Sequence, residues 1–424
     1  MKISVSSEIE RFYILLFFAL LYLTPYGLSI GGTIWLTDII SLAVLLMVCC
    51  CIFTGEIKFT TGVFRLTPSL LLLLVIFCLE FFLPFLGMIL WGDLSSISSA
   101  IRAAIYWVPF LLILSIVPFY TESNLKRFNR MIIIAVIFNL VFGLIELGIY
   151  YGKLPSFLNF RLILLDFAPQ ERFANERIMS FGFFQNSTAY GVFGFIALTH
   201  FLSRLIVLDS SKVQYYTLAF MSFSIVILST SRVPLGASLC AFVFFLFFQR
   251  KTLSNLFIMS IMACLLIITV FVLFSADVML FSRFTRIIEG GLGNDYSFHE
   301  RITVLWPNAL DFYFKLGHPV FTNPTKHTGT IDSGYLTYLL QGGWFFLGVI
   351  LIFIITSGLH AFKKSMENRT NDYFSYMTLF FMVYFFLGMI MSNPLRSPLS
   401  IAFLCFCVFG FSVRSIHKLP NNGL

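Results

Sequence analysis

The chain has 424 residues, of which 58% are hydrophobic and only 11% are charged. Soluble domains contain about 25% charged residues, and a surface this apolar is stable against lipid rather than in water, which excludes a soluble protein. The net charge of +8 does not indicate nucleic-acid binding, because the basic residues form short clusters between apolar runs, as in membrane proteins.

The apolar runs predict an all-α integral membrane protein with about twelve transmembrane helices, since about 20 apolar residues cross the hydrocarbon of a bilayer. The first run is followed by no small-residue cleavage site, so we expect it to remain as a span. The predicted spans lie near residues 12–30, 34–53, 69–90, 102–120, 131–150, 186–203, 215–230, 233–249, 255–275, 334–358, 373–392 and 397–413. Without internal repeats or low-complexity linkers, residues 1–424 are expected to form a single polytopic membrane domain.

The positive-inside rule predicts that both termini are cytoplasmic. The inner segments then carry eight Lys and eight Arg, whereas the outer segments carry three Lys and nine Arg. The outer basic residues are Arg102, Lys153, Arg161, Arg172, Arg177, Arg232, Arg283, Arg286, Arg301, Lys315, Lys326 and Arg396. Because charge alone would fix the topology, the outer preference for Arg indicates bidentate binding of an anion such as phosphate, unless it is a chance effect of small numbers.

Two outer loops are long, at residues 151–185 and 276–331, and loops of this length usually carry function. In the longer loop, apolar residues at helical spacing predict an interfacial helix near 278–288. The sequence Ser297-Phe298-His299-Glu300 resembles a capping box and predicts the start of a second helix, which carries Arg301.

The eight cysteines all lie in apolar runs, so neither a disulfide framework nor a cysteine-ligated metal is expected. The sequence has no Walker A motif, no Gly-rich dinucleotide loop and no metal-ligand spacing. These absences disfavour an ATP-driven pump and a soluble-type nucleotide-sugar enzyme, and we expect no metal and no cofactor.

Three outer arginines are candidates for binding an anion. Arg177 precedes an apolar anchor that leads into the sixth predicted span, although an interfacial Arg can also simply snorkel. Arg232 ends the short turn Ser229-Thr230-Ser231-Arg232, where a charge at the lipid border is costly unless it is paired or used. Arg301 could bind the anion or form a salt bridge with a loop carboxylate.

Candidate bases lie near the outer start of the tenth predicted span. Asp332 could cap that helix or accept a proton from a hydroxyl group. His318 and His327 could accept a proton or orient a hydroxyl group, or they could be ordinary loop residues. Glu80 lies deep in a predicted span, and we expect it to pair with Arg102 or another outer arginine.

Several short motifs, in this order, resemble those of the bacterial O-antigen polymerase and O-antigen ligase superfamily over nearly the whole chain. The matching stretches are Arg177 with Gly182 and Asn186, Ser229–Arg232, Arg301 with Trp306, Ala309 and Leu310, Leu316–Pro319, and Asp332–Leu336 followed by Gln341-Gly342-Gly343. The chain departs from the family at Phe321-Thr322-Asn323, where the family has Gly-x-Gly. Ligases tend to have His-Asn where this chain has Asp332-Ser333, which favours the polymerase.

The resemblance implies a metal-independent glycosyltransferase of the bacterial inner membrane whose active face is periplasmic. Such a polymerase transfers a growing glycan from undecaprenyl pyrophosphate to a lipid-linked repeat unit, and a chain-length regulator is a candidate protein partner. The implied roles are pyrophosphate binding by Arg177, Arg232 and Arg301, sugar stacking by Trp306, Tyr335 and Tyr338, and acceptor activation by Asp332 or His318. The alternatives are an O-antigen ligase that transfers glycan to lipid A–core, and a flippase or transporter of lipid-linked oligosaccharides.

Overall fold

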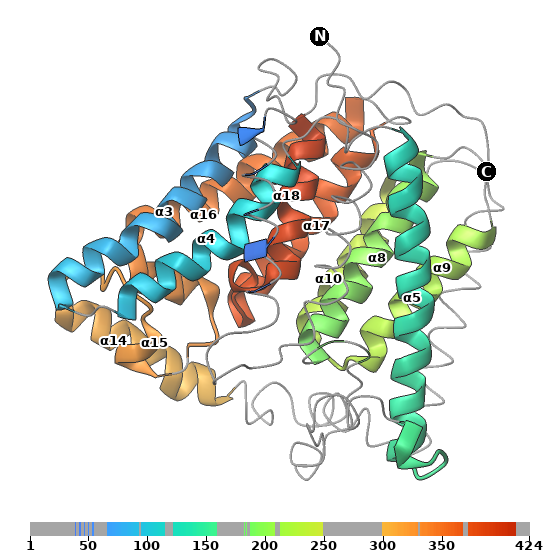
Figure 1. Cartoon of the computed structure of the whole chain (residues 1–424), viewed down its shortest axis with the longest axis horizontal. Helices are drawn as coiled ribbons and strands as arrows, with labels where there is room; N and C mark the ends of the chain where they lie inside the picture. The colour runs from blue at the N-terminus through green and yellow to red at the C-terminus, as the bar shows by residue number, and fades with distance from the viewer. Residues whose placement is uncertain are drawn as a thin grey trace. The chain divides into compact units, whose positions relative to one another are not determined.

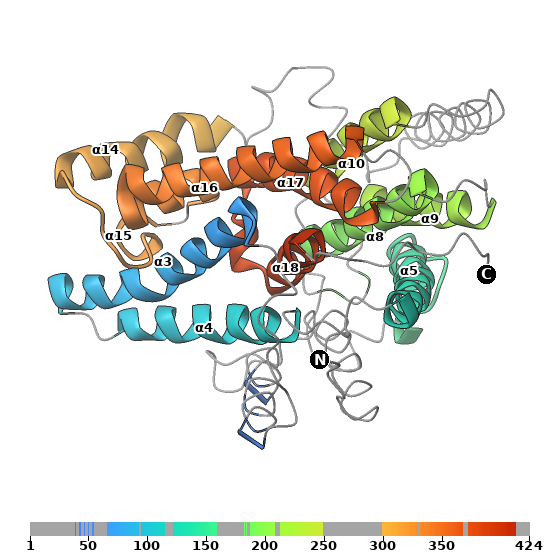
Figure 2. The ribbon, with the colours of Figure 1, turned by 90° about the horizontal axis from the view of Figure 1, so that it is seen from above.

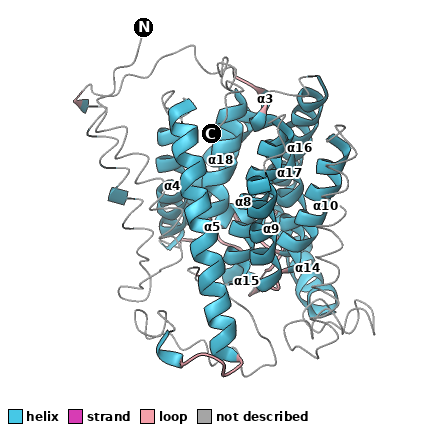
Figure 3. Ribbon diagram, turned by 90° about the vertical axis from the view of Figure 1, so that its right-hand side faces the viewer, coloured by secondary structure: helices cyan, strands magenta, loops and turns pink. Residues whose placement is uncertain are grey.

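The computed structural model describes residues 66–92, 95–114, 122–158, 182, 184, 187–207, 213–248, 299–329, 331–367 and 372–412, with a few positions between 39 and 54. All regular structure in these residues is helical, and Figure 3 shows no strand among them. The long helices are α3 (Pro68–Trp91), α4 (Ser95–Leu114), α5 (Glu122–Tyr150), α8 (Ser187–Val207), α9 (Val213–Leu228), α10 (Arg232–Phe248), α14 (Trp306–Leu316), α16 (Gly334–Glu367), α17 (Tyr373–Met391) and α18 (Pro398–Ser412). The short elements are η2 (Ser156–Leu158), η5 (Arg301–Leu305), α15 (Thr325–Thr328) and η6 (Pro394–Arg396).

The chain divides into two compact units. The first unit comprises residues 1–132 and 304–424 and contains α3, α4 and α14 to α18. The second unit comprises residues 133–303 and contains most of α5 together with α8, α9 and α10. The predicted single membrane domain therefore stays a prediction.

Five helices among the described residues are long and apolar enough to cross a membrane, namely α3, α5, α8, α16 and α17. Helices α9 and α10 and residues Leu399–Ser412 are apolar but shorter. The predicted class is therefore confirmed: the chain is an α-helical multi-pass membrane protein. The predicted spans near 12–30 and 255–275, most of 34–53 and the interfacial helix near 278–288 lie outside the described residues, so the total of twelve stays a prediction.

Several helices extend beyond the predicted spans. Helix α4 begins at Ser95, seven residues before the predicted start at Arg102, so Arg102 lies inside a helix rather than at its end. Helix α16 continues to Glu367, beyond the predicted end near 358. Hydropathy identifies the part of a helix that lies in lipid, whereas backbone hydrogen bonding continues through the polar turns at either end.

Helix α3 has clear start and stop signals. The Thr67 side chain accepts a hydrogen bond from Leu70 N at 3.2 Å, and Pro68 occupies the first turn, where no N–H is needed. Gly92 ends the helix with φ of 64°, a left-handed conformation that favours glycine. In the first unit α3 packs against both α4 and α16, as Figure 2 shows.

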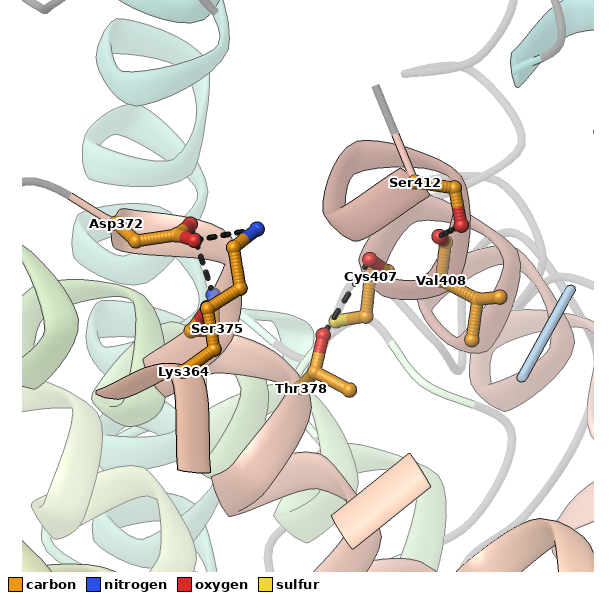
Figure 4. A network of polar contacts seen from close by, with 7 residues as sticks. All are labelled: Lys364, Asp372, Ser375, Thr378, Cys407, Val408 and Ser412. Atoms are coloured by element: carbon orange, nitrogen blue, oxygen red, sulfur yellow. Dashed lines mark hydrogen bonds and ion pairs between the residues drawn. The ribbon is translucent and has the colours of Figure 1, made fainter. Parts of the chain in front are cut away.

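One end of the first unit brings together the end of α16, the start of α17 and the end of α18. Lys364 Nζ lies 2.6 Å from Asp372 Oδ2 and also 4.4 Å from the ring centre of Phe411. Asp372 caps α17 by accepting from Ser375 N, as Figure 4 shows beside the hydrogen bond from Thr378 to Cys407 O. Thr67 and Ser412 share a hydrogen bond of 2.9 Å, so the start of α3 also lies at this end, which we call the Lys364 end.

The opposite end of the first unit brings together the residues predicted to lie on the outer side. Gly334 N donates to Ser392 O at 2.8 Å, which joins the start of α16 to the end of α17. Trp91, the last residue of α3, donates from Nε1 to Val320 O at 2.9 Å. The turn η6, which ends at Arg396, and the segment between α14 and α16 also lie here, and we call this the Arg396 end (Figure 1). The packing thus gives the alternating helix directions that the predicted topology requires, while the side of the membrane stays a prediction.

Helix α16 is interrupted at Gly343, where φ is 68° and ψ is −165°. The interruption leaves the carbonyl groups of Leu340 and Gln341 without helical donors. They accept instead from Val320 N at 2.8 Å and Phe321 N at 2.9 Å. A helix break at membrane depth is tolerated only when other protein groups satisfy the released backbone, and residues 320–321 fill this role.

In the second unit α8 packs closely on α9 and α10, and Figure 1 shows these helices in green. Two glycines of α8 allow this contact, because a Cβ at Gly191 would lie 2.5 Å from Ser229 Oγ and one at Gly194 would lie 2.9 Å from Ser222 O. Tyr190 Oη donates to Asn139 O of α5 at 2.9 Å. Small residues at such interfaces are typical of membrane helices.

We predict that Gly343→Ala destabilises the protein by about 1–3 kcal/mol, because its backbone conformation is essentially restricted to glycine. A Cβ there would also lie 2.9 Å from Pro319 Cγ. Gly348→Ala in the same helix is the matched control, since nothing lies within 4 Å of its added Cβ. Thermal unfolding of the detergent-solubilised variants measures the difference; equal midpoints for the two variants would show that the break is not specified by Gly343.

Candidate functional site

A polar cavity of about 230 Å³ lies at the Arg396 end of the first unit. Its walls come from α3, α4, α16, the segment before α15, and the connection between α17 and α18. The lining residues are Glu80, Pro84, Ser98, Ser99, Arg102, Ala103, Tyr106, Trp107, Asn323, Gln341, Leu395 and Arg396. Nine of these twelve side chains carry a hydroxyl, amide, charged group or indole N–H, and the other three are Pro84, Ala103 and Leu395. The cavity is therefore a polar site inside an apolar helical protein.

Local structure explains how these side chains meet. Arg102 lies in the second turn of α4, and Arg396 is the last residue of the 3₁₀ turn η6. Gln341 precedes the break in α16, which turns the chain at the cavity wall. Pro84 removes the helical N–H that would bond to the carbonyl of Glu80, so a backbone acceptor is released beside the Glu80 side chain.

Arg396 holds one wall of the cavity in place. Its Nη2 donates to Asn323 Oδ1 at 2.9 Å, and the same oxygen accepts from Thr325 Oγ1 at 3.0 Å. The Arg396 side chain is exposed, and a guanidinium has five N–H donors. Within the described part of the chain its other N–H groups have no hydrogen-bond partner. They are therefore available to an anion that enters the cavity.

Glu80 is the acidic residue of the cavity. Tyr338 and Gln341 form hydrogen bonds with its carboxyl group, and Arg396 is the arginine whose charge acts on it. The charge of an outer arginine thus acts on Glu80, while an ion pair between Glu80 and an outer arginine stays a prediction. Tyr338 is fully buried, and its hydroxyl also lies 3.0 Å from Asn393 Oδ1. Since a hydroxyl has one proton, Tyr338 can donate either to Asn393 Oδ1 or to the Glu80 carboxyl group at any one time.

His318 and His327 lie beside Trp91 at the same end of the unit. The ring centres of Trp91 and His327 are 5.0 Å apart, and His318 is 6.2 Å from Trp91. His318 Nδ1 lies 2.8 Å from Pro319 O. Because a carbonyl can only accept, Nδ1 carries a proton, so Nε2 of this exposed ring is the nitrogen that can act as an acceptor. This geometry suits a base.

The sequence allowed Asp332 to cap α16, but the residue directly before this helix is Ser333. Ser333 takes that position: its Oγ lies 3.5 Å from Leu336 N, and its carbonyl accepts from Thr337 N at 3.0 Å. Ser333 immediately precedes Gly334 and so is the residue whose side chain reaches the first turn. Asp332, one residue earlier, is half-buried.

The aromatic residues proposed for sugar stacking have different surroundings. Tyr335 donates to Phe386 O at 3.1 Å and packs its ring on Phe386, so it faces α17. Tyr338 is buried against Phe346, with ring centres 4.8 Å apart. Trp306 is half-buried at the start of α14, and its buried Nε1 has no hydrogen-bond partner among the described residues. Of the three, Trp306 is therefore the residue whose polar atom has no partner among the described residues, and that atom is buried.

The candidate arginines of the second unit are Arg232 and Arg301. Arg232 is the first residue of α10, and its Nε and Nη2 atoms are buried. The preceding turn is tight, with φ of 51° at Thr230 and a hydrogen bond from Ser229 Oγ to Val226 O. A positive charge at a helix N-terminus is unfavourable by about 0.3–1 kcal/mol, which a bound anion offsets. Arg301 is half-buried in η5.

Arg177 lies outside the described residues, but part of its motif is described. Gly182 N donates to Glu146 Oε2 at 2.9 Å, so this carboxylate of α5 binds the segment before α8. Gly182 has φ of 53°, and a Cβ there would lie 2.6 Å from Tyr190. The glycine of the Arg177 motif is therefore required by packing.

His318, Asp332, Trp306 and Tyr335 belong to the first unit, and Arg232 and Arg301 belong to the second. Sequence reasoning missed the cavity around Arg102 and Arg396. Both arginines belong to the outer set that is rich in Arg, and this enrichment is the sequence feature that could have indicated the site. Among the described residues, no group of three His, Cys, Asp or Glu side chains is placed to hold a metal ion. No protein-family model and no curated protein matches the chain.

We predict that Tyr338→Phe destabilises the protein by about 1–2 kcal/mol, because it leaves two polar groups, on Glu80 and Asn393, with a lost partner in an apolar environment. The control is Tyr335→Phe, which removes one hydroxyl to a backbone carbonyl, and its effect should be at most half as large. Unfolding midpoints in detergent provide the comparison. A smaller loss for Tyr338→Phe than for Tyr335→Phe would contradict the proposed hydrogen-bond network.

Proposed function

We propose that this protein is a membrane glycosyltransferase that elongates a surface polysaccharide such as O-antigen. It transfers a growing glycan from undecaprenyl pyrophosphate to a lipid-linked repeat unit. The observation that carries the proposal is the cavity lined by arginines and amides at the Arg396 end of an apolar, multi-pass helical protein. The proposed donor, acceptor and transfer reaction are taken from the motif resemblance to the O-antigen polymerase and ligase superfamily.

The chemistry of the cavity fits a sugar phosphate. Guanidinium groups match phosphate oxygens in a bidentate geometry, and the amides and hydroxyls of Asn323, Gln341, Ser98 and Ser99 can bind sugar hydroxyls. A lipid-linked substrate has an apolar tail and an anionic, hydroxyl-rich head. A polar cavity enclosed by membrane helices accommodates the head while the tail stays in lipid.

In the proposed reaction, the bond between the anomeric carbon and the pyrophosphate oxygen breaks, and the acceptor hydroxyl oxygen forms the new glycosidic bond. Arg177, Arg232 and Arg301 stabilise the charge that develops on the departing pyrophosphate. Asp332 accepts the proton of the acceptor hydroxyl, with His318 Nε2 as the alternative base. No metal or cofactor takes part in this scheme.

The proposed setting is the bacterial inner membrane, with both termini cytoplasmic and the Arg396 end facing the periplasm. Lys363 and Lys364 lie at the opposite end of α16, in keeping with the positive-inside rule. A chain-length regulator is the proposed protein partner. A ligase that transfers to lipid A–core is the second candidate, because it would use the same donor; Asp332-Ser333 in place of His-Asn favours the polymerase.

We predict that Arg232→Ala and Arg177→Ala, made separately, leave the protein in the membrane but shorten the polysaccharide. Loss of one group that stabilises the departing charge should lower turnover by about 10²–10³-fold. The readout is the ladder of chain lengths from cells that carry only the variant, with an immunoblot for protein level. Lys315→Ala is the control, since Lys315 is an exposed outer cation that pairs with Asp311.

If both arginine variants gave wild-type chain lengths, the pyrophosphate assignment would be wrong. Deletion of the gene separates the two candidate functions. Loss of the polymerase leaves single repeat units on the lipopolysaccharide, whereas loss of the ligase leaves none.

Substitution of the two candidate bases identifies the one that accepts the proton. Asp332→Asn should lower kcat by about 10²–10⁴-fold, whereas His318→Gln should retain most of it. Ser333→Ala is the control for damage to the start of α16. Polymerisation of a defined lipid-linked repeat unit by the purified protein gives kcat. The reverse order of effects would assign the role to His318.

A further inference from the structure

We propose that the cavity at the Arg396 end is the acceptor site, where Arg102 and Arg396 bind the pyrophosphate of a second polyprenyl-linked sugar. Glu80 then accepts a hydrogen bond from a hydroxyl group of that sugar. This inference rests on the proposed function and specifies which of the two lipid-linked substrates occupies the cavity.

A polymerase of this kind binds two pyrophosphates at once, one on the donor and one on the acceptor. The arginines assigned to the donor, Arg232 and Arg301, belong to the second unit. Arg102 and Arg396 belong to the first unit and have no role in that assignment. A second pair of arginines, which lines a cavity of the first unit, matches the need for a second anion site.

The candidate bases belong to the same unit as the cavity. Asp332 is two residues before Gly334, whose N–H bonds to Ser392 O, and Ser392 is four residues before Arg396. His318 is linked to the cavity wall through the segment whose Phe321 N bonds to Gln341 O. Because a base must reach the hydroxyl that it deprotonates, the substrate bound beside these residues is the acceptor.

The charges of the cavity distinguish its two parts. Arg396 retains unused N–H donors, and both arginines lie at its exposed rim, where a phosphate can reach them. Glu80 would repel a phosphate, so the phosphate contacts the rim rather than the floor. A carboxylate has about four acceptor positions, and Tyr338 and Gln341 use two of them. The remainder can accept from a sugar hydroxyl.

The size of the cavity limits what it holds. Pockets that enclose a whole drug-sized ligand have volumes of about 300–1,000 Å³. The observed volume of about 230 Å³ is below that range and suits a single phosphorylated sugar. Donor and acceptor carry the same sugar next to the pyrophosphate, so the volume indicates that only this lipid-linked end of the substrate enters the cavity.

The decisive test counts bound ligands. Native mass spectrometry of the full chain in nanodiscs should show two undecaprenyl pyrophosphates per wild-type protein. The Arg102→Ala/Arg396→Ala variant should bind one, as should Arg232→Ala, while Lys315→Ala should bind two. Undecaprenol, which lacks the charge, and inorganic pyrophosphate, which lacks the lipid, are the comparison probes, and neither should occupy both sites.

The kinetic test separates the substrates. In polymerisation with defined donor and acceptor, Arg396→Ala should raise the acceptor KM by about tenfold to a hundredfold and leave the donor KM unchanged. Arg396→Lys, which retains the charge, should lie between Arg396→Ala and wild type and keeps the test informative if the alanine variant is poorly folded. Glu80→Gln should raise the acceptor KM with little change in pyrophosphate binding.

Other results overturn the inference. Two bound undecaprenyl pyrophosphates in the double variant, or an unchanged acceptor KM, would remove the acceptor assignment while the polymerase function stands. Loss of co-purified phosphatidylglycerol alone would identify the site as one for a phospholipid head group. Arginine-dependent binding of two ligands without polymerisation would instead overturn the proposed function and leave a two-anion binding protein.

Discussion

A backbone carbonyl in lipid must find a donor within the protein, and this requirement is most demanding at Gly343. The helix is interrupted there, and Leu340 and Gln341 bond to Val320 and Phe321 instead. Those two bonds hold the segment that leads to Asn323 against α16, and Asn323 in turn holds Arg396. The cavity therefore depends on a backbone interruption that is satisfied by a segment about twenty residues earlier in the chain.

The same arrangement places opposite charges near one another without neutralising the site. Glu80 is held by Tyr338 and Gln341, which share one face of the first part of α16, so its position is fixed by hydrogen bonds as well as by the charge of Arg396. Arg396 still presents donors toward the open rim. A substrate head with both a phosphate and hydroxyl groups can therefore be bound by the two ends of one cavity, each with its complementary partner.

The sequence was sufficient to predict the apolar helices of the described region, because hydropathy over about 20 residues reports directly on lipid contact. The start of α4 was misplaced, since four of the five residues from Ser95 to Ser99 are serines and resemble a loop although the helix has already begun. The Gly342-Gly343 pair was noticed only as part of a motif, and the break that it forms depends on partners distant in sequence. The cavity was missed for the same reason, because five separate segments form its walls. Tyr335 and Tyr338 show the limit clearly: three residues apart on one helix, they contact α17 and the Glu80 site respectively.

The α16–α17 pair is fixed at both of its ends, by Gly334 with Ser392 and by Lys364 with Asp372. Sliding one helix along the other by a single turn, about 5.4 Å, would break both connections at once. The pair is therefore held in one register. Gly343 divides α16 into a nine-residue arm beside the cavity and a longer shaft anchored at Lys364. Because the arm is bonded to Ser392 at one end and to residues 320–321 at the other, the wall that it gives to the cavity is fixed at both ends although the helix is interrupted.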